Sequence, residues 1–222
     1  MPRKRVQIGL EIADKRVFAA GLDWPGWCRP GRDREAALDT LARYAARYAP
    51  VLELAGQPFD IGATPAFEVV EELPGNASTS FGVPDVRFEV DSRRVTRAEA
   101  ERLAAIVEAS WTLLDRIAAT APAKLRKGPR GGGRDRDKVV AHVTESDGGY
   151  ARVLGIKHPD LDPSDRPARD ALRAQMLDVL RQPSDGAPIA GKKWPPRYAA
   201  RRIAWHALDH AWEIEDRSDP AG

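Results

Sequence analysis

The feature that most constrains the fold of this chain is a change of sequence pattern near residue 94. Before that point, short segments alternate apolar and polar residues and are separated by turns rich in Pro and Gly. After it, apolar residues recur every three or four positions over long segments. Alternation indicates β-strands, whereas the longer spacing indicates amphipathic helices. We therefore predict two domains: a small α+β module over residues 1–94 and an all-α domain over residues 95–222.

Within the first domain, residues 5–13 (RVQIGLEIA) and 16–24 (RVFAAGLDW) are expected to form paired strands joined by a turn at 13–15. A loop dense in Pro and Gly follows, and then a helix for which Asp33 is a suitable N-cap. The segments AFEVVEEL and VRFEVD supply two later strands. The predicted element order is β-β-α-β-β.

The second domain is predicted to hold four helices, over residues 96–119, 135–154, 162–182 and 196–217. The first opens with Thr96 and Glu99 at the spacing of a capping box. Four amphipathic helices joined by loops of uneven length favour a four-helix bundle.

Composition narrows the classes of function. The formal net charge is +2 with acidic and basic residues interspersed, which does not indicate a nucleic-acid binder. The single cysteine, Cys28, excludes an internal disulfide and a thiolate-rich zinc cluster. No apolar run approaches the roughly 18 residues of a membrane span, and the opening residues lack the apolar segment of a signal peptide. We expect a cytoplasmic protein.

Three of the four histidines are predicted to point into the bundle. His206 and His210 are four apart on the apolar face of the last helix, and His142 falls on the inward face of the second. If those helices are antiparallel, the three rings lie at one level. Three imidazoles suit a divalent metal, with zinc or nickel preferred to iron or manganese, and leave an open coordination position. The alternative is a set of hydrogen-bonded core histidines.

Two carboxylates lie near these histidines in the sequence. Glu145 is three residues after His142, and Glu213 is three residues after His210. Each is a candidate fourth ligand, outer-shell acceptor or catalytic acid–base, and each is equally explained as a solvated or salt-bridged side chain. The fourth histidine, His158, lies beyond its helix and is expected to be a loop residue.

The segments DKVVAHVTESDGGYARVLG and RRIAWHALDHAWEIEDR resemble the histidine segments of the DinB/YfiT-like superfamily of metalloenzymes. The resemblance covers residues 96–218 and implies a four-helix bundle of up-down-down-up topology. It also implies that His142, His206 and His210 form a metal triad, commonly for zinc or nickel. Characterised members include transferases and isomerases that use low-molecular-weight thiols. Where members often carry Glu five residues after the first histidine, this chain has Asp147.

The segment RVFAAGLDWPGWCRPGRDREAALDTL resembles the HicB-type antitoxin, a partial ribonuclease-H-like unit. In this chain Trp27 precedes Cys28 and shifts the cysteine by one position from the family pattern. Such units are usually non-catalytic binding or oligomerisation modules, so a homo-oligomer is one expectation. Cys28 is expected to be a packed or loop thiol. Trp24 and Trp27 either face a ligand or stabilise their turn by packing.

A basic, glycine-rich segment, KLRKGPRGGGRDRDK, connects the first two helices of the bundle. Arg130, Arg134 and Arg136 within it are candidates for recruiting an anionic substrate such as a carboxylate- or phosphate-bearing thiol. The alternative is a solvated linker. The segment lacks the interleaved aromatic residues of a single-strand binder and the Gly-Lys-Ser/Thr of a phosphate loop.

Two hypotheses of different class follow. In the first, the chain is a metal-dependent transferase or hydrolase whose three-histidine site activates a thiol or water for reaction with a small molecule. In the second, it is a non-catalytic binding or regulatory protein, with a HicB-like module that recognises a partner and a structural or vestigial metal site.

Overall fold

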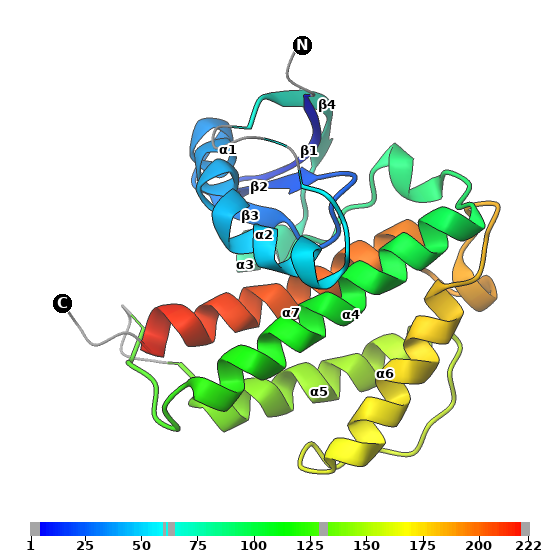
Figure 1. Cartoon of the computed structure of the whole chain (residues 1–222). Helices are drawn as coiled ribbons and strands as arrows, with labels where there is room; N and C mark the ends of the chain where they lie inside the picture. The colour runs from blue at the N-terminus through cyan, green and yellow to red at the C-terminus, as the bar shows by residue number, and fades with distance from the viewer. Residues whose placement is uncertain (1–4, 60, 62–64, 129–132, 219–222) are drawn as a thin grey trace.

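The computed structural model describes residues 5–59, 61, 65–128 and 133–218. These form a mixed α+β structure, with a four-stranded sheet in the N-terminal part and long helices after it (Figure 1). None of the helices within those ranges is long and apolar enough to cross a membrane.

The sheet has the strand order β3-β2-β1-β4. β1 (Val6–Ala13) and β2 (Arg16–Gly21) form the predicted antiparallel hairpin, and β4 (Phe67–Pro74) pairs in parallel with β1. β3 (Cys28–Gly31) pairs with β2 in the segment that the sequence predicted to be a loop. Pro is tolerated there because β3 is an edge strand, where one row of backbone groups needs no partner.

The predicted helix after Asp33 forms as two consecutive helices, α1 (Arg34–Arg43) and α2 (Ala45–Leu54), joined at Tyr44. The side chain of Asp33 accepts a hydrogen bond from the backbone N–H of Ala36 at 2.8 Å, as expected of an N-cap.

The prediction of a strand at VRFEVD is wrong. After the short helix α3 (Ala77–Phe81), this segment ends in a 3₁₀ turn, Glu89–Ser92. The carboxylate of Asp91 accepts the backbone N–H of Phe88 at 2.9 Å and pairs with Arg201, which fixes the turn. The alternating pattern therefore reflects burial of Phe88 against the sheet rather than strand pairing.

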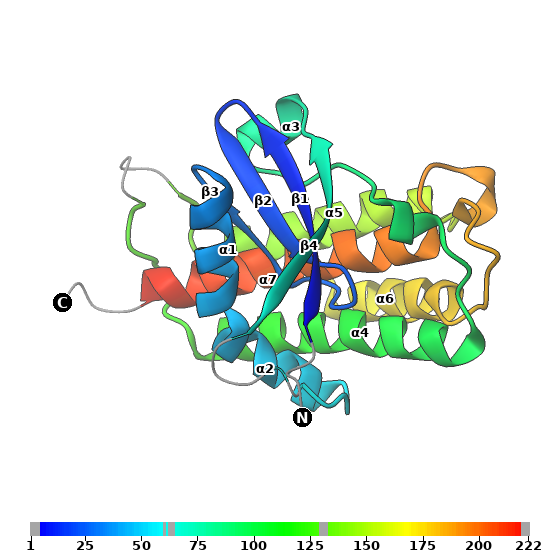
Figure 2. The same cartoon turned by 90° about the horizontal axis from the view of Figure 1, so that it is seen from above.

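Both faces of the sheet are covered. Along β2, Val17 and Ala19 belong to the core that includes α1 and α2, whereas Phe18 and Ala20 belong to a core that includes Phe88. The second core also contains Trp205 of α7 (Pro196–Ser218), whose ring meets Phe18 edge-on at 6.3 Å. Figure 2 shows the sheet lying across α7.

All four predicted C-terminal helices are present. The others are α4 (Arg97–Thr120), which opens with the predicted capping box, α5 (Arg136–Val153) and α6 (Arg166–Leu180). α4 and α7 run side by side in one direction, and α5 and α6 run in the other (Figure 1). The antiparallel pairing of α5 with α7 is evident at both ends. The backbone N–H of Arg126, which precedes α5, donates to the carbonyl of Arg217 near the end of α7. Tyr150, near the end of α5, packs on Trp194, which lies just before α7.

The helix α7 is central to the molecule and is buried on several sides. Its residues Leu208 and Trp212 join the core of the N-terminal module, and Arg201 forms a buried ion pair with Asp91. Other residues of α7 join the core shared with α4, α5 and α6. The regions 1–94 and 95–222 therefore share an extensive interface, and α7 has one side left to face α5.

Candidate metal centre

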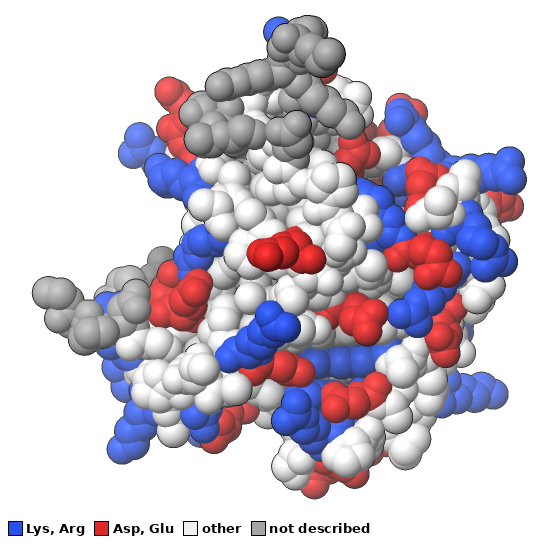
Figure 3. Space-filling model, in the orientation of Figure 1, with Lys and Arg blue, Asp and Glu red and all other residues white. Residues whose placement is uncertain are grey.

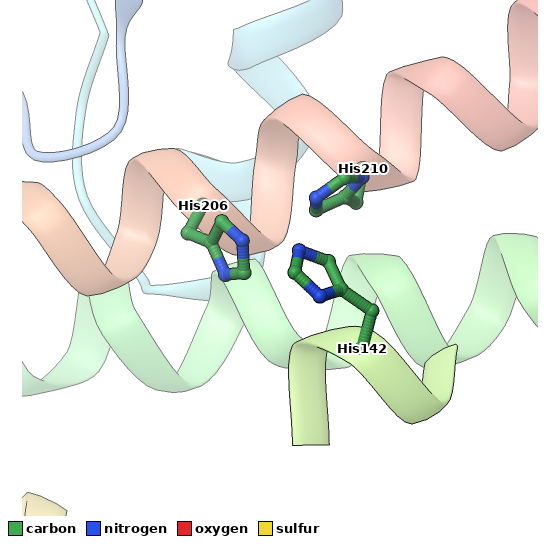
Figure 4. A group of neighbouring side chains, drawn as sticks. All are labelled: His142, His206 and His210. Atoms are coloured by element: carbon green, nitrogen blue, oxygen red, sulfur yellow. The ribbon is translucent and has the colours of Figure 1, made fainter. Parts of the chain in front are cut away.

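The three histidines that the sequence selected lie together between α5 and α7 (Figure 4). One ligand atom from each of His142, His206 and His210 lies within 4.8 Å of the others. The ring centroids are 5.2 Å apart for His142 and His206, 5.0 Å for His142 and His210, and 4.8 Å for His206 and His210. His142 points from α5 toward the two rings on α7. The depths estimated from the sequence are therefore confirmed.

A hydrogen bond orients one of the three rings. His210 Nδ1 donates to Glu213 Oε2 at 2.7 Å, and the other oxygen of Glu213 accepts from Arg217 at 2.6 Å. These two bonds lower the pKa of Glu213, that with His210 first, so its carboxylate is ionised at neutral pH. An ionised carboxylate can only accept, so Nδ1 carries a proton, and Nε2 is the nitrogen that faces a ligand.

The other two imidazoles are held neutral. Burial, followed by the neighbouring His210, places the pKa of His206 well below its usual value, and the same two causes lower the pKa of His142. His206 is 7% exposed, and its Nδ1 is buried without a hydrogen-bond partner among the described residues. Neutral imidazole is the form that binds metals. His142 and His206 can therefore bind a divalent cation without prior loss of protons.

The remaining predicted site residues lie in different surroundings. Glu145 is exposed, but its charge acts to raise the pKa of His142. Arg134 is exposed and acts in the opposite direction on the same ring. Arg136 donates to the carbonyl of Ala121 at 2.8 Å at the end of α4 and pairs with Asp137. Arg130 lies outside the described residues.

His158 is a loop residue, as expected, and its two ring nitrogens contact the carbonyls of Pro159 and Gly148. A groove of about 670 Å³ between α4, α5 and the start of α6 includes Arg136 and Arg169. It contains none of the three clustered histidines, because it opens on the opposite face of α5.

Sequence reasoning missed three residues around His206. The ring of Tyr150 lies 5.7 Å from that of His206, and the ring of Trp205 lies 6.1 Å away. The guanidinium of Arg202 lies 4.8 Å from the ring centre of Trp205, and its charge helps to lower the pKa of His206. Helical spacing offered a signal, since Arg202 precedes His206 by four residues and Tyr150 follows His142 by eight.

Asp147, at the position where the DinB/YfiT pattern often has Glu, takes part in a separate buried cluster. Its oxygens accept hydrogen bonds from Arg173 at 2.9 Å and from Trp111 at 3.3 Å. Arg173 and Arg169 also bind Asp115 of α4, at 3.3 and 3.1 Å. Burial raises the pKa of Asp147 to about 6, although Arg173 opposes the shift. This cluster ties α4, α5 and α6 together.

The aromatic residues and the thiol of the N-terminal module are packed. Trp27 is fully buried, donates to the carbonyl of Leu41 at 3.0 Å and stacks on Tyr48. Trp24 packs edge-on against Phe59. Burial raises the pKa of the Cys28 thiol to about 12, so it is a neutral packed side chain. Turn-stabilising packing therefore accounts for these residues.

Charges of both signs are interspersed over the face of the molecule drawn in Figure 3. Comparison of this chain with protein-family models, with curated proteins and with solved structures finds no match. The function is accordingly argued from the geometry of the histidine cluster.

Proposed function

We propose that this chain binds one divalent metal ion through His142, His206 and His210 and uses it to activate a thiol or water. The observation that carries the proposal is the convergence of three imidazole nitrogens, within 4.8 Å of one another, from two antiparallel helices. The group contains no fourth His, Cys, Asp or Glu from the described part of the chain. A site with three protein ligands retains a position for water or substrate, as catalytic zinc sites do.

The donor set favours a borderline metal. Three neutral imidazoles suit zinc or nickel, and they accept iron; manganese fits less well because it prefers oxygen ligands. Glu213 would act from the outer shell, by holding the ring of His210 in the required tautomer. A metal bound in this way lowers the pKa of a coordinated water or thiol and so supplies a nucleophile at neutral pH.

The resemblance of residues 96–218 to the DinB/YfiT-like superfamily gives this chemistry a direction. It supports a transferase that uses a low-molecular-weight thiol, or a hydrolase, acting on a small molecule. The directions of the four helices agree with the up-down-down-up topology that the resemblance implies. Function is carried by the site rather than by the fold, so the chemistry of the metal site decides which reaction takes place.

Metal titration of the purified, metal-stripped protein tests the proposal. We expect one equivalent of zinc or nickel to bind, and His206→Ala to weaken binding more than about a hundredfold because one of three ligands is lost. His158→Ala is the matched control, since His158 lies in a loop outside the cluster, and it should bind like the parent protein. Equal binding by all three proteins, or by none, would refute the proposal.

The second candidate function is that of a binding or regulatory protein with a structural metal. It is favoured by apolar side chains exposed on the N-terminal module: Val70 on the edge strand β4 and Phe81 on α3, 46% and 86% exposed. An edge strand with apolar neighbours is a surface that a partner can extend. A pull-down and a DNA gel-shift test this function, and the absence of a protein or DNA partner in both would count against it.

A further inference from the structure

An arginine lies beside the candidate metal centre, one helical turn before His206. The guanidinium carbon of Arg202 is 4.8 Å from the ring centre of Trp205 and 5.9 Å from that of Tyr150. Tyr150 in turn lies 5.7 Å from the ring of His206. Two aromatic rings thus hold the guanidinium next to the histidine cluster, and cation–π contacts of this kind fix its position without using its hydrogen-bond donors.

Those donors lack protein partners. Arg202 Nη1 is buried and has no hydrogen bond, and no carboxylate among the described residues forms an ion pair with this side chain. Other arginines of α7 form ion pairs, Arg201 with Asp91, Arg197 with Glu99 and Arg217 with Glu213, although Arg197 Nε and Arg217 Nη2 are also buried without a partner among the described residues. A buried polar atom without a partner destabilises a fold, and a ligand that pairs with it removes that cost. What sets Arg202 apart is that none of the described carboxylates forms an ion pair with it.

A series of aromatic contacts connects the surroundings of Arg202 with a surface groove. Tyr150 packs on Trp194, and Trp194 packs on Tyr198. These last two residues line a groove of about 330 Å³ together with Asp85, Arg87, Pro188, Lys192 and Lys193. The hydroxyl of Tyr198 donates to Asp85, which leaves the groove lined by more cations than free carboxylates. An anionic molecule is therefore favoured in this groove.

We infer that Arg202 binds the carboxylate of the substrate whose reactive thiol or oxygen occupies the open position of the metal. This inference rests on the proposed metal site. Arg202 and His206 are one turn apart on α7, and the ring of Tyr150 lies 5.9 Å from the guanidinium carbon of the first and 5.7 Å from the ring of the second, so a small molecule suffices to reach from one to the other. The substrate class is therefore a small carboxylic acid that also carries a thiol or hydroxyl group. Arginine suits this role because its planar donors match a carboxylate.

Binding of two matched thiols to the cobalt-loaded protein tests the inference. The first, 3-mercaptopropionate, carries a carboxylate; the second, 3-mercapto-1-propanol, replaces it with a hydroxyl group. Coordination of either thiol to cobalt gives a charge-transfer absorption band that can be titrated. We expect the carboxylate to improve affinity about tenfold or more, and Arg202→Met to abolish this preference while cobalt stays bound. Arg116→Met, which removes an exposed arginine of α4, is the control.

Stability separates this role from a structural one. Methionine retains the packing of the arginine stem on Trp205 and removes the unpartnered nitrogen, so Arg202→Met should melt at the same temperature as the parent protein or higher. Arg201→Met is the contrast: it leaves Asp91 buried without its partner and should lower the melting temperature. A large loss of stability in Arg202→Met would identify a structural arginine and overturn the inference.

The outcomes distinguish this inference from the proposed function. An unchanged carboxylate preference in Arg202→Met would overturn the role of Arg202 and leave the metal site standing. If the parent protein binds none of zinc, nickel and cobalt, the proposed function fails, and propionate added to the metal-free protein then decides the matter for Arg202. A shift of the Trp205 indole signal in NMR spectra of the parent protein, absent from Arg202→Met, would support the inference, and identical spectra would refute it.

Discussion

The helix α5 contributes to two polar clusters that differ in how their groups are paired. On one side, Asp147 joins Arg173, Arg169 and Asp115, and both oxygens of Asp147 accept hydrogen bonds. On the other, His142 faces His206 and His210. There Glu213 engages one ring, while His206 Nδ1, Arg202 Nη1 and Trp205 Nε1 are buried without partners.

The two clusters differ in how far their polar groups are paired within the protein, and this difference separates a structural role from a candidate functional one. Two carboxylates and two arginines balance one another's charge in the first cluster, which joins three helices, although Arg173 Nη2 is buried there without a partner among the described residues. The second cluster gathers nitrogen atoms with lone pairs and unpaired donors around one carboxylate. A cation and an anion from solution would complete such a group, which is the composition that we propose for it: a metal bound to a carboxylate-bearing substrate.

The largest effect is expected from breaking the first cluster. Asp147→Ala leaves Arg173 buried with only Asp115 as its partner, and should lower the free energy of unfolding by about 3 kcal/mol. Zinc affinity of the folded protein should not change, because Asp147 does not belong to the histidine group. Urea unfolding and zinc titration measure the two quantities. Asp137→Ala, an exposed position of the same helix, should change stability by less than about 0.5 kcal/mol.

The role of Glu213 in the second cluster is tested against that of Glu145, an exposed glutamate of α5 outside the cluster. Glu213→Gln removes the charge that fixes the tautomer of His210 and should weaken zinc binding about 10- to 100-fold. Glu145→Gln, the matched control on α5, changes an exposed side chain and should weaken binding less than about threefold. Equal effects of both substitutions would show that Glu213 has no special role in orienting the ring.

The pH dependence of stability distinguishes the clusters further. The pKa of Asp147 is raised from 3.8 to about 6, so between these values the folded state binds more protons than the unfolded state. The contribution of Asp147 to stability therefore falls as pH rises through that window, by at most about 1.4 kcal/mol per pH unit. Urea unfolding of the metal-free protein and of Asp147→Asn from pH 4 to 7 isolates this contribution. A difference between the two proteins that is independent of pH would contradict it.

The smallest effect is expected at Arg134. This side chain is exposed, and solvent screens its charge, although it acts on the pKa of His142 and His206. Arg134→Gln should change zinc affinity less than about threefold at 0.15 M salt. Titrations at low and physiological ionic strength measure this effect. A large loss of zinc affinity that does not depend on salt would mean that Arg134 belongs to the site. It would favour the sequence-based prediction that the basic segment recruits an anionic substrate.

Much of this architecture could be predicted from the sequence because its signals are local. The hairpin, the N-cap Asp33, the capping box of Thr96 and Glu99, and the four C-terminal helices follow from short-range patterns. The three histidines could be placed together because helical geometry fixes both face and depth. In contrast, β3, the parallel pairing of β4 and the turn at Asp91 depend on tertiary partners.

The same reasoning explains what was missed at the site. In the sequence, Arg202 cannot be distinguished from any other charged residue of an amphipathic helix. The structure shows that its Nη1 is buried without a hydrogen-bond partner among the described residues. Asp147 likewise looks like a departure from a catalytic pattern until Arg173 and Trp111 are seen around it. Pairing between distant elements, which a single sequence does not reveal, separates a structural charge from one kept for a ligand.

A crystal structure of the zinc-loaded protein, with anomalous scattering recorded at the zinc edge, is the most direct test of the proposed three-histidine metal site. We expect one ion between α5 and α7, at about 2.0–2.1 Å from one nitrogen of each of His142, His206 and His210. A water molecule should occupy the fourth position. An ion bound elsewhere, a fourth ligand from the protein, or no anomalous peak at the three rings would contradict it.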